Sequence, residues 1–237
     1  MGPEPRSYHL WYFFFGFYFL FLFVIISFCI YIFFMVIEQN ISKLSLSHGQ
    51  VLWVIDGMRI VEWLDRPALD SILKKFRREG VPDFSSTGQK GRQGSDFSYG
   101  FEQVMDCVVA MKLVADGLAF RHVVALMKSD PIKLRQYYNR SLTESETGMG
   151  EIVEVKAEDG RKTSISGLYL DFNAVISKAG VLSTTGPRLL DPWEAMNRYM
   201  GLFSMLHPTG MVRLSQLATE VVRLANHAPL FKRGRKG

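Results

Sequence analysis

The uncharged, apolar run that begins at Leu10 and ends at Ile37 sets the strongest limit on how this chain can fold. Its 28 residues are rich in Phe, Tyr, Ile and Leu. A helix of that length, rising about 1.5 Å per residue, is longer than the hydrocarbon thickness of a bilayer, roughly 30 Å. The run also exceeds the apolar core of a signal peptide, and neither a basic segment nor a small-residue cleavage site accompanies it. We therefore expect a transmembrane helix within residues 1–37.

The composition of the same run supports a second interpretation. Ten of the 18 phenylalanines lie in it, whereas Ala, Gly, Val and Asp are nearly missing from it and plentiful afterwards. Translation of T-rich DNA upstream of a gene would give this composition, and the protein would then start at Met35 or Met58 and be cytoplasmic. If the run is a true membrane segment, Arg6 and Lys43 flank it on opposite sides and leave its orientation undecided. A DNA-binding C-terminal part would have to be cytoplasmic.

Positive charge is concentrated in the rest of the chain. The net charge is +5, and residues 1–57 hold two basic and three acidic residues, which leaves 26 basic against 20 acidic in residues 58–237, a net of +6. This excess favours an anionic partner such as nucleic acid or a membrane surface. Cys29 and Cys107 have no spacing typical of a disulfide framework or a zinc site. No catalytic grouping of side chains stands out either, so we expect neither an enzyme nor a cofactor or metal.

Residues 59–128 combine helical patterning with cationic segments. Apolar residues recur at helical spacing from Ile60 to Phe76, and Pro67 predicts a break between two short helices. Gly80 and Pro82 are expected to end the second helix. The Gly- and Ser-rich residues 83–99 then fit a basic hairpin, or wing. A long apolar helix is expected from Tyr99 up to a stop at residues 116–117, and a short helix over residues 118–127.

This order of elements resembles the winged helix-turn-helix of the MerR family of DNA-binding proteins. In that family a two-helix reader and a basic wing precede an aromatic-led helix, a glycine and a short helix, which stand here as FSYGFEQVMDCVVAMKLVADG and GLAFRHVVALM. The resemblance covers residues 59–128. It implies a domain at residues 58–130 that places a helix in the major groove of double-stranded DNA and its wing on the flanking backbone. A long coiled-coil helix should follow and make a homodimer, but the helix expected over residues 132–142 runs into SLTESETGMG, which leaves the mode of dimerisation open.

The candidate DNA-binding residues lie on the second helix and in the wing. Cations there would neutralise phosphates, and side chains near the start of the helix would read base edges. A solvated charged face is the plainer explanation of the helix alone, but a cationic Gly-rich loop directly after it favours DNA contact. Asp70 would be repelled by phosphate, so we expect it to face a base edge or cap the helix. The candidates are Ser71, Lys74, Lys75, Arg77, Arg78, Lys90 and Arg92.

Other side chains are expected to be structural. We expect His122 on the outer face of its short helix, Cys107 close to the core, and Trp53, Trp63 and Trp193 in the core or an interface.

Residues 131–228 predict a small α+β module for self-association or partner binding. Alternating apolar residues on both sides of Asp159 and Gly160 indicate a β-hairpin over residues 151–170. Residues 184–192 are expected to form a loop, followed by a helix with Asp191 as its N-cap and by a final helix over residues 212–226. A basic tail fills residues 229–237. The whole chain is thus expected to be α+β and mostly helical, with residues 38–57 as a linker after the hydrophobic segment.

These features favour a transcriptional regulator that binds DNA through a winged helix-turn-helix, tethered to a membrane if residues 10–37 span one. One alternative is a membrane-anchored interaction or scaffold protein whose basic face meets lipid headgroups or a partner protein. Another is a DNA-handling accessory factor of a mobile element, since winged helices also serve recombination and replication.

Overall fold

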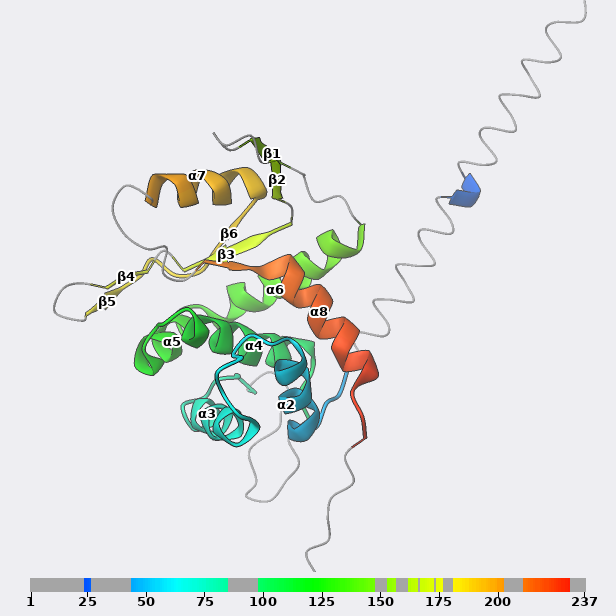
Figure 1. Cartoon of the computed structure of the whole chain (residues 1–237), viewed down its shortest axis with the longest axis vertical. Coiled ribbons are helices and arrows are strands. Elements are labelled where there is room, and N and C mark those ends of the chain that lie inside the picture. Colours follow the sequence, from blue (N-terminus) through cyan, green and yellow to red (C-terminus); the bar gives the residue numbers. More distant parts are fainter. Residues whose placement is uncertain are drawn as a thin grey trace, which may run out of the picture. The chain divides into compact units, whose positions relative to one another are not determined.

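The computed structural model describes residues 24–26, 44–84, 98–147, 153–156, 162–165, 167–172, 174–176, 181–202 and 211–230 (Figure 1). The chain divides into two compact units, Met1–Lys43 and Leu44–Gly237. In the first unit residues 24–26 are helical. The rest of the expected transmembrane helix at residues 10–37, most of the wing and the end of the basic tail lie outside the described residues. Among the helices that are described, none combines the length and the apolar character needed to cross a membrane.

The second unit combines seven described helices with short antiparallel strands, which confirms the expected mixed α+β class (Figure 1). Its helices are α2 (His48–Gly57), α3 (Arg66–Arg78), α4 (Phe101–Ala115), α5 (Phe120–Met127), α6 (Pro131–Thr147), α7 (Pro192–Leu202) and α8 (Leu214–His227). Its strands are β1 (Val153–Lys156), β2 (Lys162–Ile165), β3 (Tyr169–Asp171), β4 (Val175–Ile176), β5 (Leu182–Ser183), β6 (Arg188–Leu190) and β7 (Met211–Arg213).

Helix α2 lies inside the segment expected to be a linker. It begins with a capping box, in which the Ser47 hydroxyl accepts from the Gln50 amide at 3.4 Å and the Gln50 side chain accepts from the Ser47 amide at 2.9 Å. Val51, Val54 and Ile55 are fully buried. Residues 48–57 therefore contribute to the core of the second unit.

The prediction of two short helices separated by a break at Pro67 is wrong. Residues 58–64 form turns, with Arg59 at a φ of 51°. One helix, α3, starts at Arg66, and the Asp65 side chain caps it by accepting from the Ala68 amide at 2.8 Å. Pro67 lies in the first turn, where its missing N–H would have had no partner within the helix, so it starts the helix and does not break it.

Helices α3 and α4 end in the same way, as their glycines predicted. Gly80, at a φ of 76°, donates to the carbonyl of Arg77, and the next amide, that of Val81, donates to the carbonyl of Phe76. Gly117, at a φ of 89°, starts the matching pair of bonds at the end of α4. A residue with a Cβ is disfavoured in this left-handed conformation, which is why glycine marks both stops.

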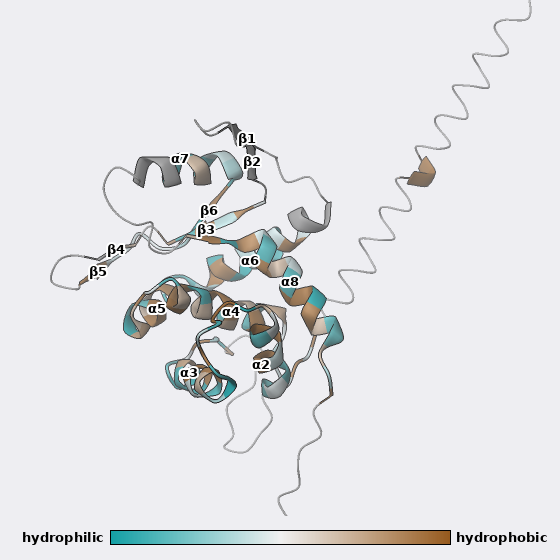
Figure 2. Ribbon diagram, viewed as in Figure 1, coloured by the Kyte–Doolittle hydropathy of each residue, from teal (hydrophilic) through white to brown (hydrophobic). Residues whose placement is uncertain are grey.

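The core of the second unit is built around α4, which packs against α5, α6 and α8. Helix α8 lies along α6 and also contacts α2, as Figure 1 shows. Figure 2 shows brown, apolar residues on α4 and α8, and Val104, Val108, Leu214 and Val221 of these helices are fully buried. Elements expected in a domain at residues 58–130 and a module at residues 131–228 therefore share one core.

A small sheet and two hairpins complete the unit. Strand β3 pairs antiparallel with both β6 and β7, so that Leu170 lies opposite Leu189 and Val212. The hairpin expected over residues 151–170 is confirmed by β1 and β2, and β4 pairs with β5 in a second hairpin. The loop expected over residues 184–192 is wrong in part, because β6 forms there by pairing with a strand 19 residues earlier.

Three helix ends in the second half of the chain depend on a cap, on the position of a glycine and on strand pairing. Asp191 caps α7 as expected, accepting from the Glu194 amide at 2.7 Å. Helix α6 continues past residue 142 to Thr147, since neither glycine nor proline interrupts it before Gly148. The last helix starts at Leu214, because Met211–Arg213 is held in the sheet as β7.

Candidate nucleic-acid interface

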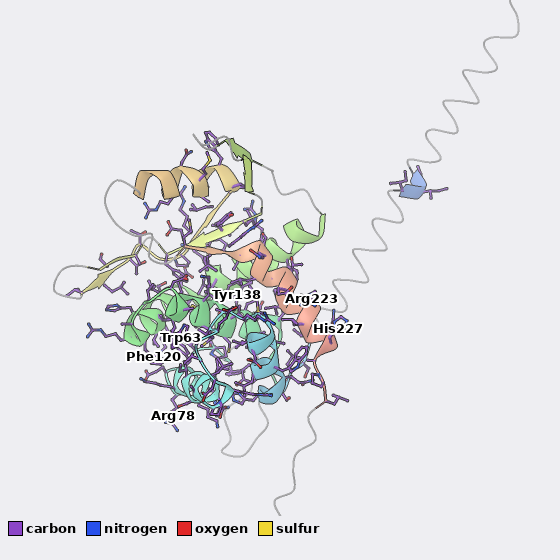
Figure 3. All side chains as sticks on the ribbon, viewed as in Figure 1. Trp63, Arg78, Phe120, Tyr138, Arg223 and His227 are labelled. Carbon is purple, nitrogen blue, oxygen red and sulfur yellow. The ribbon has the colours of Figure 1, made fainter. Side chains whose placement is uncertain are left out.

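Helix α3 has one buried and one exposed face. Leu69, Leu73 and Phe76 are its buried residues. Four of the predicted DNA-binding residues are exposed and recur at a spacing of three or four, which places them on one side of the helix. Figure 3 shows Arg78 on the outer side of α3. We call this set the basic face: Ser71, Lys74, Lys75 and Arg78.

Helix α5 supports the basic face from behind. The rings of Phe76 and Phe120 lie 4.5 Å apart between centroids, and the Lys75 ammonium is 4.2 Å from the centroid of Phe120. One aromatic ring of α5 thus packs against the buried face of α3 and attracts a cation of the exposed face. The side chain of Lys128, just after α5, reaches the end of α3, since a Cβ on Gly80 would lie 3.5 Å from its Cε.

Asp70 has a different role from the one expected. It neither caps α3, which is the role of Asp65, nor stands unpaired toward a base edge. One carboxylate oxygen lies 2.5 Å from the Lys74 ammonium and the other 2.7 Å from Nε2 of His48 on α2. Partial burial would raise the pKa of Asp70, but the hydrogen bonds with Lys74 and His48 outweigh it and lower that pKa. Asp70 therefore stays ionised and joins α2 to α3.

Arg77 lies apart from the basic face. It is half-buried and acts on Tyr99, whose pKa is raised to about 12 by burial and by Cys107, while the charge and hydrogen bonding of Arg77 lower it. The direction of Arg77 follows from helix geometry, because it precedes the exposed Arg78 by one residue and so points about 100° away from it. Of the five predicted residues on α3, this one is turned toward the interior.

The predicted wing begins and ends at described residues that lie close together. Leu46 and Tyr99 exchange two backbone hydrogen bonds, of 2.9 and 2.8 Å, and the hydroxyls of Ser45 and Ser98 are 2.5 Å apart. Phe84, at the start of the loop, meets the Tyr99 ring edge-on at 5.2 Å. The described residues on either side of positions 85–97 therefore lie next to each other. Lys90 and Arg92 lie outside the described residues.

A buried polar contact joins α4 to α6 in the core of the second unit. Asp106 of α4 is buried and accepts a 3.0 Å hydrogen bond from the Tyr138 hydroxyl, and burial raises the pKa of Asp106 to about 7. Arg135 pairs with Asp83 at 2.6 Å, next to the start of the wing. Sequence reasoning missed this contact, although an aspartate at a core position of an apolar helix was the signal that could have indicated it.

Several residues outside the interface differ from expectation. His122 is buried, not on an outer face, because it shares a side of α5 with Val123 and Leu126. Trp63 and Trp193 are exposed, which excludes the core for both residues, and the interface that was the other expectation stays a prediction. Cys107 is buried as expected, and burial raises the pKa of its thiol. Within the described ranges, no three His, Cys, Asp or Glu side chains are grouped so that they could hold a metal ion.

Comparisons of the chain with protein-family models, curated proteins and solved structures find no match. The assignment of a function therefore depends on the residues and geometry described above.

Proposed function

We propose that this protein binds double-stranded DNA through a winged helix-turn-helix and regulates transcription. The observation that carries the proposal is the basic face, an exposed row of cations on a helix whose opposite side is fixed in the core. An α-helix fits the major groove of B-DNA, and lysine and arginine are the side chains that meet phosphates and guanine edges there.

The order of the elements supports this assignment. Helix α2 precedes α3 by a turn, and α4 and α5 follow in the chain. This is the order expected from the resemblance to the MerR family, with α2 taking the place of the first reader helix that we expected after Arg59. In a helix-turn-helix the second helix enters the groove, and here that helix carries the basic face.

The basic face divides into two kinds of contact. Ser71 lies in the first half of α3 and can reach a base edge, while Lys74, Lys75 and Arg78 carry the positive charge that would neutralise phosphates. Lys128 adds a cation next to the end of α3. Each neutralised phosphate releases counterions, so affinity should fall steeply as salt is raised.

The test is DNA binding by the full chain, purified in a mild detergent because of its apolar residues 10–37. A chain that began at Met58 would lack α2 and its buried side chains, and therefore the first helix of the proposed motif. Fluorescence anisotropy with a randomised duplex pool at two salt concentrations measures affinity, and sequencing of the bound fraction measures specificity. The decisive variant changes Lys74, Lys75 and Arg78 to Ala.

A matched triple variant controls for net charge. Lys133, Arg188 and Arg223 lie outside α3 and are also exposed, and each is paired with a nearby acid. Their change to Ala removes the same number of positive charges, three. We expect the basic-face variant to lose most of its affinity for DNA. The slope of the logarithm of affinity against the logarithm of salt concentration should fall in magnitude by up to about 2.7, at about 0.9 for each of three phosphates. The control variant should keep the affinity and the slope of the parent chain. The proposal fails if the parent chain binds no duplex or if both triple variants lose affinity equally. Enrichment of a recurring sequence is the result expected for a regulator.

A further inference from the structure

Helix α3 carries a single acid, Asp70, among its five cations. Its carboxylate is paired with Lys74, one of the four residues of the basic face. An anionic group at this position opposes the approach of DNA phosphates, and it also holds the Lys74 ammonium away from them. A second cationic partner that neutralises Asp70 in place of Lys74 should therefore strengthen DNA binding.

His48, the first residue of α2, contacts this carboxylate directly. Its Nε2 lies 2.7 Å from Asp70, and its Nδ1 lies 3.3 Å from the hydroxyl of Tyr99. The side chains of His48 and Asp70 are 26% and 28% exposed, so solvent screens their interaction only in part. The imidazole is thus held between Asp70 of α3 and the hydroxyl of Tyr99.

The groups that face His48 come from α3, from Tyr99 and from α2 itself, and α8 packs against the same helix. Burial raises the pKa of Tyr99 to about 12, and Arg77 acts on that same hydroxyl. The pKa of Asp70 is lowered, and Lys74 completes the cluster from α3. Helix α8, which also packs against α2, approaches Gly57 at its far end with the apolar side chain of Leu224. Ser47 and Gln50 on α2 are uncharged cap residues.

We propose that His48 is a proton-dependent positioning residue for DNA binding, which acts through Asp70 on Lys74. The inference rests on the proposed function. A histidine changes charge between about pH 5 and 8. With a neutral imidazole, the His48, Asp70 and Lys74 side chains sum to zero charge and Asp70 holds Lys74. With an imidazolium the sum is +1, Asp70 has a second cationic partner, and Lys74 is released toward phosphate.

The sign of the pH effect follows from linkage. If the protonated cluster binds DNA better than the neutral one, DNA binding must take up a proton, and the bound DNA must in turn favour protonation of His48. Affinity then rises as pH falls. Uptake of at most one proton limits the change to about tenfold for each pH unit, and we expect the affinity at pH 5.5 to exceed that at pH 7.5 by about 3- to 10-fold.

The experiment measures anisotropy of the full chain on one defined duplex at pH 5.5, 6.5 and 7.5 and constant ionic strength. His48→Gln keeps a side chain that can form hydrogen bonds but cannot become positively charged. Asp70→Asn removes the carboxylate and keeps its shape. The matched control is His227→Gln, since His227 is exposed at the end of α8, where its Nδ1 contacts the carbonyl of Arg223 (Figure 3).

The proposal expects a rise in affinity at low pH for the wild type and for His227→Gln. His48→Gln should show little pH dependence, and Asp70→Asn should bind at every pH about as tightly as the wild type does at pH 5.5. A wild-type pH slope that persists in His48→Gln overturns the inference, as does a wild type without a slope. If thermal unfolding shows that His48→Gln does not fold, Asp70→Asn decides by the same criterion. A complete lack of duplex binding at all pH values would instead remove the proposed function, and this inference with it.

Discussion

Helices α3 and α4 follow each other in the chain and have similar lengths, yet they are built in opposite ways. Eleven of the 15 residues of α4 are buried, but only three of the 13 residues of α3 are. The sequence of α4 is therefore set by packing on nearly every side, whereas most of α3 is free of that constraint. A helix fixed along one narrow apolar side can present its remaining side chains to a partner, so the difference indicates where function lies.

The largest expected effect is on the packing of α4. Leu113 is fully buried, and Leu113→Ala should lower the free energy of unfolding by about 2–5 kcal/mol, because it removes apolar contacts and leaves a cavity. The matched change on α3 is Lys74→Ala, which loses only a partly exposed ion pair worth about 0–1 kcal/mol. Denaturant unfolding followed by circular dichroism measures both. Equal midpoints for the two variants would contradict the contrast between the helices.

A smaller effect concerns the one carboxyl buried in α4. The pKa of Asp106 is about 7 in the folded chain, above its ordinary value of 3.8, because burial disfavours the charged form. The folded state therefore holds a proton that the unfolded state has already released. The resulting stability is complete below about pH 4 and is lost as pH rises through about 7.

Asp106→Asn tests this dependence, because the amide oxygen can still accept from Tyr138 but does not titrate. Between pH 5.5 and 7.5 we expect the wild type to lose roughly 2 kcal/mol more stability than the variant, from about 1.4 kcal/mol for each pH unit up to the pKa. Denaturant unfolding at both pH values measures the difference. Equal losses of stability in the wild type and the variant would mean that Asp106 contributes little to the pH dependence.

The sequence predicted those features that depend on neighbouring residues. Gly80 and Gly117 marked the ends of α3 and α4, and Asp191 marked the start of α7, because a cap or a left-handed turn is decided within a few residues. The alternation around Asp159 predicted the β1–β2 hairpin for the same reason. Pro67 was misread, since the same residue breaks the interior of a helix but is favoured in its first turn.

Features that depend on distant residues were not predicted. One partner of Asp70 is His48, 22 positions earlier, and no local pattern joins these two residues. Strand β6 has three residues and exists through its pairing with β3, so its composition resembled a loop. The cations of α3 were visible in the sequence, but which of them point outward depended on where α3 starts and which of its sides is buried.

The smallest expected effect is at Lys75, where the exposed side of α3 borders its buried side. Its ammonium stands 4.2 Å above the ring of Phe120, which also packs against the buried Phe76. A double-mutant cycle with Lys75→Met and Phe120→Leu should give a coupling energy of about 0.5–1 kcal/mol, the usual size of a cation–π interaction at a partly exposed site. Methionine keeps most of the apolar stem and removes the charge, so the cycle separates attraction from packing. A coupling near zero would mean that the ring does not attract the charge of Lys75, and α5 would then support α3 through the packing of Phe120 against Phe76.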